Sequence, residues 1–247
     1  MDASLKVSGG VFPVQLKQTR VLPLLKKPTL DPDEASSYRP ISNLPYLSKL
    51  IERVVVSRFA EHSVTCSLLP VQQSAYQPFH STETALLSVH NDLVRSIDNG
   101  KVSLLVLLDL SAAFDTVDHQ LLLSVLANRF SVDSNALSWF ESYLTDRTQT
   151  FTYKGEQTSS FPVDCSVPQG SVLGPRCFLS YTEDIADLLE EHAVQSHLYA
   201  DDTQFHDSCR PGYTDTLRLH RHTVLSLVML RRRHQLLVQV PSSATEC

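Results

Sequence analysis

The chain contains 247 residues, of which 42% are hydrophobic and 19% are charged, and its formal net charge is −6. This length accommodates one large domain or two small ones, and the composition is that of a globular protein, not of a disordered or fibrous one. No run of about eighteen apolar residues occurs, which excludes a membrane-spanning helix, and residues 1–12 lack the features of a signal peptide. We therefore expect an intracellular protein, with nucleus and cytoplasm both open.

Charge is distributed unevenly along the chain. Residues 1–60 carry nine Lys or Arg and five Asp or Glu, residues 61–207 carry six and twenty, and residues 208–247 carry six and two. An acidic centre between basic ends suits a metal-using site flanked by nucleic-acid-binding surfaces, and ordinary solvated surface explains the pattern equally well. The cysteines show neither C-x-x-C spacing nor zinc-finger spacing, so we expect free or buried thiols. They are Cys66, Cys165, Cys177, Cys209 and Cys247.

Hydrophobic spacing predicts the secondary structure in chain order. The first hundred residues predict a strand and two helices, at Val21–Leu25, Leu47–Ala60 and Thr82–Ile97, with a loop over residues 30–37. Val102–Leu108 is almost all Val and Leu, which is typical of a strand buried on both faces, and Asp109 follows it. Helices are then predicted at His119–Phe130, Ser134–Leu144 and from Gly174 to about Glu191. Further strands are predicted at Gln149–Tyr153, Thr158–Val163, Val194–Tyr199 and Thr203–His206.

This order of strands and helices indicates an α/β architecture. After Pro211 the sequence becomes rich in Arg and His and shows no sustained apolar face. We expect residues 209–247 to form a divergent basic tail that packs poorly.

Three aspartates lie where a carboxylate needs a partner. Asp109 ends a buried strand, and Asp201 and Asp202 occupy the turn between two short strands. A buried carboxylate is costly unless it is hydrogen-bonded or paired with a cation. Carboxylates brought together from distant strands make a site for hard divalent ions, chiefly Mg²⁺. Taken singly, each is more often a strand-end cap or a solvated turn.

Five segments, in order, resemble sequence blocks of reverse transcriptases from non-LTR (LINE-type) retrotransposons. Residues 107–115 (LLDLSAAFD) resemble motif A, residues 168–175 (PQGSVLGP) motif B, and residues 199–202 (YADD) motif C. Residues 38–44 (YRPISNL) resemble the fingers motif, and residues 73–84, which begin with QSAY, resemble the next block. A YADD tetrapeptide alone is weak evidence, but five blocks in the same order are specific. The resemblance extends from about Arg20 to Ser208.

This resemblance implies a fold and an activity. The fold is α/β (α+β), with the fingers and palm of a right-hand polymerase and an antiparallel palm sheet backed by helices. Residues 1–100 are the fingers-like region and residues 101–208 the palm with motifs A, B and C. The activity is that of an RNA-directed DNA polymerase, which uses an RNA template, a DNA primer and dNTP.

The resemblance also assigns roles to single positions. Asp109, Asp201 and Asp202 are the catalytic set, and together with the Leu110 carbonyl they hold two Mg²⁺ ions, for which Mn²⁺ can substitute. Phe114 lies under the sugar of the incoming nucleotide, where a ring excludes a 2′-hydroxyl. The remaining nucleotide-binding positions are Lys26, Lys27 and Arg39 on the triphosphate and Gln169 and Gly170 on the base pair. The motif B loop is completed by Pro168, Ser171, Gly174 and Pro175.

Several of these residues also have a purely structural interpretation. Phe114 is equally a core aromatic, the basic residues are equally surface charges, and the motif B glycines equally form a loop-to-helix turn. His119, next to Asp118, is expected to be a helix-start residue and not a metal ligand.

The family continues after motif C with a helix, a motif with a lysine, a primer-grip hairpin and a helical thumb, and the sequence after Ser208 shows none of these patterns. We therefore expect an incomplete copy, thumb absent, that extends primers weakly or not at all. The alternative is a retroelement-derived nucleic-acid-binding protein without catalysis, although pure binding has no need of three clustered aspartates. The resemblance names no protein partner and no membrane.

Overall fold

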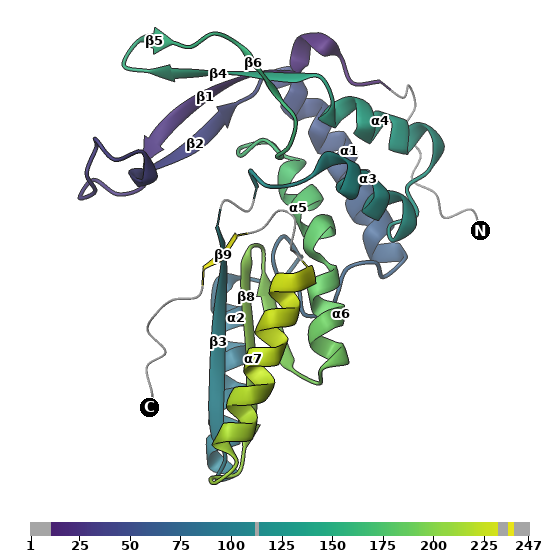
Figure 1. Ribbon diagram of the computed structural model, residues 1–247. Helices are drawn as coiled ribbons and strands as arrows, with labels where there is room; N and C mark the ends of the chain where they lie inside the picture. Colours follow the sequence, from purple (N-terminus) through teal and green to yellow (C-terminus); the bar gives the residue numbers. More distant parts are fainter. Residues whose placement is uncertain (1–10, 112–113, 232–236, 240–247) are drawn as a thin grey trace. The chain divides into compact units, whose positions relative to one another are not determined.

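The strands of this protein form two sheets, one in each of two units. The computed structural model describes residues 11–111, 114–231 and 237–239 (Figure 1). Unit 1 comprises Met1–Leu68 and Phe114–Tyr181, and unit 2 comprises Leu69–Ala113 and Thr182–Cys247. Each unit thus combines two separate segments of the chain. The predicted division into fingers and palm at residue 100 concerns functional regions, and it remains a prediction.

The sheet of unit 1 has the order β2-β1-β4-β5, with β6 also paired to β4. The strand β1 pairs antiparallel with β2 and parallel with β4, while β5 and β6 run antiparallel to β4. The bounds are β1 Gln18–Leu25, β2 Tyr38–Asn43, β4 Arg147–Tyr153, β5 Glu156–Gln157 and β6 Phe161–Val163, with short 3₁₀ turns at Val14–Leu16 and Ala35–Ser37. The spacing rules did not predict β2. It contains Pro40, which lacks a backbone N–H and is tolerated at the edge of a sheet.

Helices α1 (Tyr46–Thr65), α3 (His119–Asn128), α4 (Ser134–Leu144) and α5 (Gly174–Thr182) belong to this unit up to Tyr181. The Phe59 ring of α1 lies 5.5 Å from the Phe130 ring, just after the end of α3, and 5.8 Å from the Phe140 ring of α4, centroid to centroid. All three side chains are buried. Burial of a large apolar side chain contributes about 1.5–3 kcal/mol, so this cluster is a main source of stability in unit 1.

The start of α3 confirms the structural reading of His119. Asp118 caps the helix, since its Oδ1 accepts a hydrogen bond from the Leu121 N–H at 2.7 Å. The His119 ring is buried, and its Nε2 lies 2.7 Å from the Ser166 carbonyl oxygen. The histidine therefore fastens the helix start to the segment before motif B.

The sheet of unit 2 has the order β7-β8-β3-β9, and every pairing in it is antiparallel. Its strands are β3 Val102–Ser111, β7 Gln195–Tyr199, β8 Asp202–Cys209 and β9 Leu237–Gln239. This confirms the predicted antiparallel sheet, with the buried strand beside the motif C hairpin. The prediction that β3 is buried on both faces holds for one face only: Val106 and Leu108 are buried, whereas Leu105 and Leu107 are 37% and 51% exposed.

Helices cover both faces of this sheet (Figure 1). On one face α2 (Thr82–Asp98) contacts β3 and β7, and a capping box formed by Ser81 and Thr84 begins it. On the other face α6 (Asp184–Glu191) and α7 (Thr214–Arg231) contribute to a single apolar core. That core includes Val106, Leu108, Ile185, Leu189, Leu198, Phe205, Val224 and Val228.

Two predictions about helices are wrong. The helix expected from Gly174 to about Glu191 is divided into α5 and α6, with Glu183 between them. No Gly or Pro lies at the break, so the sequence carries no local signal for it. The tail expected to pack poorly contains α7, in which Leu217, Val224 and Val228 are almost fully buried. These residues share one helical face, but the Arg and His residues between them obscure the hydrophobic periodicity in the sequence.

The described cysteines, which are Cys66, Cys165, Cys177 and Cys209, are free thiols, as predicted. Within residues 11–111, 114–231 and 237–239, no helix combines the length and hydropathy that crossing a bilayer requires.

Substitution of Val224 tests the packing of α7. Val224 is fully buried in the unit 2 core, so Val224→Ala should lower the free energy of unfolding by about 2 kcal/mol. Urea denaturation measures this loss. The neighbouring exposed Thr223→Ala serves as control and should change stability by less than about 0.5 kcal/mol. Equal effects of the two substitutions would contradict the buried position of α7.

Candidate active site

The predicted catalytic aspartates lie at one end of the unit 2 sheet. Leu108 of β3 is paired with Thr203 of β8, so Asp109 follows that pair on one strand and Asp202 precedes it on the other. Asp201 occupies the turn before Asp202. Backbone pairing alone thus brings the three positions together from about ninety residues apart in sequence. The side chains of Asp109 and Leu110 lie outside the described part, and the backbones of both pair with β9.

A buried glutamine supports the motif C turn. Ala200 has a left-handed backbone, with φ of 57°, which is uncommon for a residue with a side chain. Its N–H donates to Gln73 Oε1 at 3.1 Å, and the Ala75 N–H donates to the same oxygen at 3.0 Å. Backbone hydrogen bonds between Leu198 and the residues on either side of Gln73 complete the contact.

Sequence reasoning missed this role of Gln73. The available signal was its place at the start of the QSAY block, which lies about 125 residues before motif C. The two family blocks are in direct contact in unit 2, where the first supplies the acceptor that the strained turn of the second requires.

Asp201 is partly exposed and Asp202 is exposed, so both are accessible to a hydrated cation. Burial and the charge of Asp201 raise the pKa of Tyr76, which keeps this phenol neutral beside the carboxylate. Among the side chains that the structure describes, no group of three or more His, Cys, Asp or Glu is arranged to hold a metal ion. Asp109, the third member of the predicted set, is not among those side chains. Carboxylate oxygens on a tight turn are suitable donors for Mg²⁺.

Motif B belongs to unit 1, where β2 and its own serine define its shape. The Ser42 N–H donates to the Gln169 carbonyl at 2.8 Å. Gly170 has φ of +106°, and a Cβ there would approach the Ser42 carbonyl oxygen to 3.0 Å. Glycine is therefore required both by the backbone conformation and by the contact with β2.

The end of the motif B loop is a helix start. Ser171 accepts a hydrogen bond from the Gly174 N–H at 2.8 Å, and its own N–H donates to the Pro168 carbonyl at 3.0 Å. A Cβ on Gly174 would collide with the Ser171 hydroxyl, and Pro175 occupies the first turn of α5, where its missing N–H costs nothing. The structural and functional readings of this loop are compatible.

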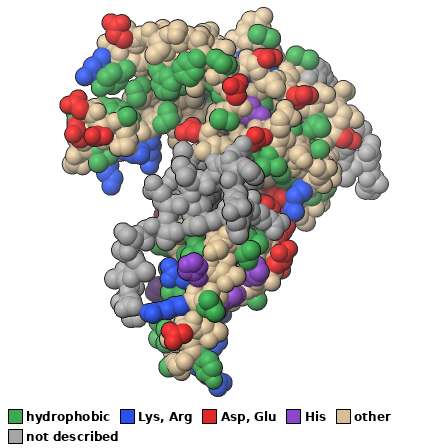
Figure 2. Space-filling view, viewed as in Figure 1, with side chains coloured by type: hydrophobic (Ala, Val, Ile, Leu, Met, Phe, Trp, Pro, Cys, Tyr) green, Lys and Arg blue, Asp and Glu red, His purple; other side chains and the backbone are tan. Residues whose placement is uncertain are grey.

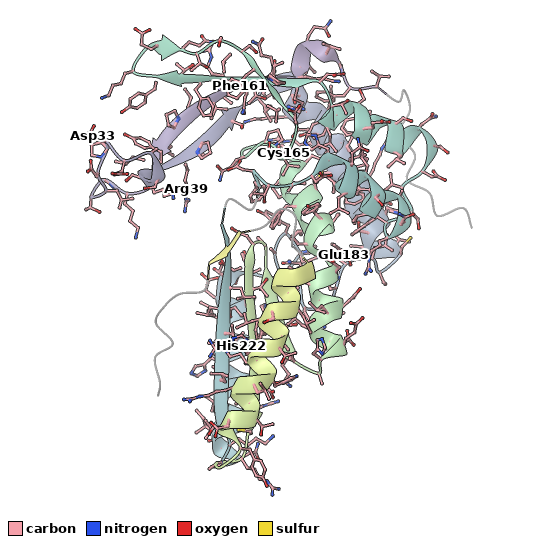
Figure 3. The ribbon with its side chains drawn as sticks, in the orientation of Figure 1. Asp33, Arg39, Phe161, Cys165, Glu183 and His222 are labelled. Carbon is pink, nitrogen blue, oxygen red and sulfur yellow. The ribbon has the colours of Figure 1, made fainter. Side chains whose placement is uncertain are left out.

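The predicted triphosphate-binding cations lie at the β1–β2 end of unit 1. Lys26, Lys27 and Arg39 are all exposed, and Lys26 Nζ donates to the Ser36 carbonyl at 2.9 Å. Arg39 projects away from its strand (Figure 3). Basic and acidic side chains both gather at this end, so it is not a purely basic surface (Figure 2). The cations are accessible there, and their binding of a triphosphate remains a prediction.

Phe114 lies at the junction of motifs A and B in unit 1. Its ring stacks on Phe178, with centroids 4.9 Å apart and an interplanar angle of 25°, and its carbonyl accepts the Val167 N–H at 2.9 Å. Phe114 thus contacts Phe178, as its interpretation as a core aromatic predicts. Its contact with the nucleotide sugar remains a prediction. Beside it, Asp115 lines a pocket of about 410 Å³ between the unit 1 strands and residues 164–169, and burial raises the pKa of its carboxyl group.

Comparison with known proteins decides the family. Residues 25–217 match the model of the family described as reverse transcriptase (RNA-dependent DNA polymerase). The chain belongs to the reverse transcriptase family. Its resemblance to the enzymes of non-LTR retrotransposons is confirmed by its relatives.

These relatives are encoded by mobile elements. The chain is 30% identical over 199 residues to the RNA-directed DNA polymerase from mobile element jockey of Drosophila melanogaster, which covers 78% of this chain and 21% of that protein. It is 32% identical over 176 residues to the probable RNA-directed DNA polymerase from transposon BS of the same species, which covers 70% and 19%. The reverse transcriptase chain thus spans about a fifth of the length of these relatives.

Solved structures show the fold. Apo telomerase from Candida tropicalis, truncated from its C-terminal domain, superposes with a TM-score of 0.61 at 14% identity and covers 94% of this chain and 52% of that one. Telomerase from Candida albicans gives a TM-score of 0.55 at 12% identity, covering 94% and 43%. These likenesses and the family match confirm the predicted right-hand polymerase fold.

Substitution of Gln73 tests the support of the motif C turn. Gln73→Leu has nearly the same volume but leaves the Ala75 and Ala200 N–H groups without their acceptor. It should lower the free energy of unfolding by about 2 kcal/mol or more. Chemical denaturation measures the loss. Gln72→Leu is the matched control, because Gln72 contributes its backbone carbonyl, which the substitution retains. A neutral Gln73→Leu would refute the role.

Proposed function

We propose that this reverse transcriptase chain catalyses RNA-directed DNA synthesis by two-metal nucleotidyl transfer. It would join a dNTP to the 3′ end of a DNA primer on an RNA template. The observation that supports this most is the β3–β8 register, which brings the backbone of Asp109 level with Asp202 and beside the Asp201 turn. A protein that only binds nucleic acid has no use for this convergence.

In this proposal Asp109, Asp201, Asp202 and the Leu110 carbonyl hold the two ions, Mg²⁺ or, as a substitute, Mn²⁺. Such ions, when bound, promote attack by a hydroxyl and stabilise the leaving pyrophosphate. Lys26, Lys27 and Arg39 bind the triphosphate, for which the fork of Arg is well suited. Gln169 and Gly170 contact the base pair, and Pro168, Ser171, Gly174 and Pro175 shape the loop that carries them.

Primer extension on poly(rA)/oligo(dT) tests the chemistry. Extension should require Mg²⁺ or Mn²⁺, stop on addition of EDTA, and resume when the ion is restored. Asp201→Asn should lower the rate by roughly a hundredfold or more, because it weakens ion binding at the reacting centre. Asp98→Asn is the control, since Asp98 is an exposed aspartate at the end of α2 in the same unit.

The outcomes separate the candidate functions. Extension that survives Asp201→Asn unchanged would contradict the assignment of the carboxylates. Binding that weakens steeply with salt, without extension in either ion, would favour the alternative of a nucleic-acid-binding protein without catalysis. Nucleotidyl transfer depends on holding the primer accurately, and in this proposal the chain extends primers weakly.

Substitution of Phe114 tests the choice of sugar. If its ring lies under the nucleotide sugar, Phe114→Val opens space for a 2′-hydroxyl and should raise rNTP relative to dNTP incorporation by about tenfold. The ratio of kcat/KM values for UTP and dTTP on poly(rA) measures this. Phe178→Leu is the control, because it removes the other ring of the stacked pair. A ratio that changes equally in both variants would assign Phe114 to the core alone.

A further inference from the structure

Glu52 is a fully buried glutamate on α1 that contacts motif B. Its Oε2 accepts hydrogen bonds from the Val172 N–H at 2.6 Å and the Leu173 N–H at 3.2 Å. Its Oε1 accepts one from the Ser48 hydroxyl at 2.8 Å. Glu52 and Ser48 are both 0% exposed. Glu52 and Val172 are 120 residues apart in sequence. None of the roles assigned above involves Glu52.

The surroundings of Glu52 supply the hydrogen bonds that a buried carboxyl group requires. Burial, and secondly the charge of Glu52, raise the pKa of the Cys177 thiol and of the Tyr143 phenol, so both neighbours stay neutral. A buried carboxylate is tolerated only when it is well hydrogen-bonded. Here the donors immediately precede α5, where the helix dipole also favours an anion.

The motif B loop is thereby held from two sides. On one side β2 binds it, through the hydrogen bond from Ser42 to Gln169 and the close approach of Gly170. On the other side α1 binds it through Glu52 at Val172 and Leu173. Two residues at most separate the two attachments. The intervening backbone is therefore too short to absorb a displacement of Val172 and Leu173, and such a displacement would also move Gln169 and Gly170.

We propose that Glu52 is a positioning residue for motif B. Its carboxylate fixes the loop so that Gln169 and Gly170 are placed to contact the base pair, as the proposed function assigns. Glu52 itself touches no substrate. The inference rests on the proposed function for its consequence in catalysis, but the attachment itself is a property of unit 1 and is testable without catalysis.

Hydrogen exchange of the 247-residue chain tests the attachment. Glu52→Ala should speed exchange of the Val172 and Leu173 amides by about tenfold or more, since each loses a hydrogen bond to a charged acceptor. Glu52→Gln should restore most of the protection, because the amide oxygen can accept both N–H groups while its NH₂ donates to Ser48. Glu61→Gln, an exposed glutamate on the same helix, should leave exchange unchanged.

Primer extension tests the consequence. Glu52→Ala should raise the KM for dTTP on poly(rA)/oligo(dT) by about tenfold with a much smaller change in kcat, and Glu52→Gln should recover most of the loss. Ser63→Ala controls for destabilisation, because Ser63 is a buried hydroxyl of α1 that bonds the Phe59 carbonyl and is remote from motif B in sequence. It should leave KM unchanged even where it lowers stability.

Hydrogen exchange tests the attachment of motif B, and primer extension tests its consequence for catalysis, so the two claims can fail independently. Unchanged exchange at Val172 and Leu173 in Glu52→Ala overturns the inference, whether or not the chain extends primers. Faster exchange with an unchanged KM in an active chain also overturns it, because the loop then moves without consequence. A wild-type chain that extends no primer counts against the proposed function, and the exchange experiment still decides the attachment.

Discussion

The register between β3 and β8 is the constraint on which the rest of unit 2 depends. Side chains alternate across a sheet, so a slip of one residue would turn the buried face of β3 to the outside. Val106 and Leu108 on β3 and Thr203 and Phe205 on β8 are buried together on the face that α6 and α7 cover. The same register sets Asp109 level with Asp202. The apolar core therefore decides where the backbones of these two aspartates lie.

Much of this arrangement could be predicted from the sequence, and for a physical reason. A segment made almost entirely of Val and Leu is a strong signal for a central strand. Ser134–Leu144 has clear helical spacing, and its predicted bounds match α4. The family blocks then supplied the pairing partner of β3, which spacing alone does not give. The fold and the family were predictable because both depend on patterns that extend over many residues.

The features that could not be predicted depend on single contacts. In β2, Pro40 breaks the strand pattern and is accommodated only because the strand is at an edge. In α7, Arg and His residues lie between the buried positions Leu217, Val224 and Val228, so hydrophobic spacing alone does not identify them. The break at Glu183 coincides with the passage from unit 1 to unit 2 near Tyr181. Each of these requires knowledge of a neighbour that is distant in sequence.

Gln73 and Glu52 extend this argument to the candidate site. Both are polar residues whose local sequence suggests surface positions, and both are buried, where they accept hydrogen bonds from the backbone of a family motif. A loop with unusual backbone conformation has N–H groups that no regular ladder satisfies, so acceptors must come from elsewhere in the chain. Residues that contradict the hydrophobic pattern are therefore expected beside functional turns. In this protein Gln73 lies in unit 2 with motif C and Glu52 lies in unit 1 with motif B, so each motif is supported from within its own unit.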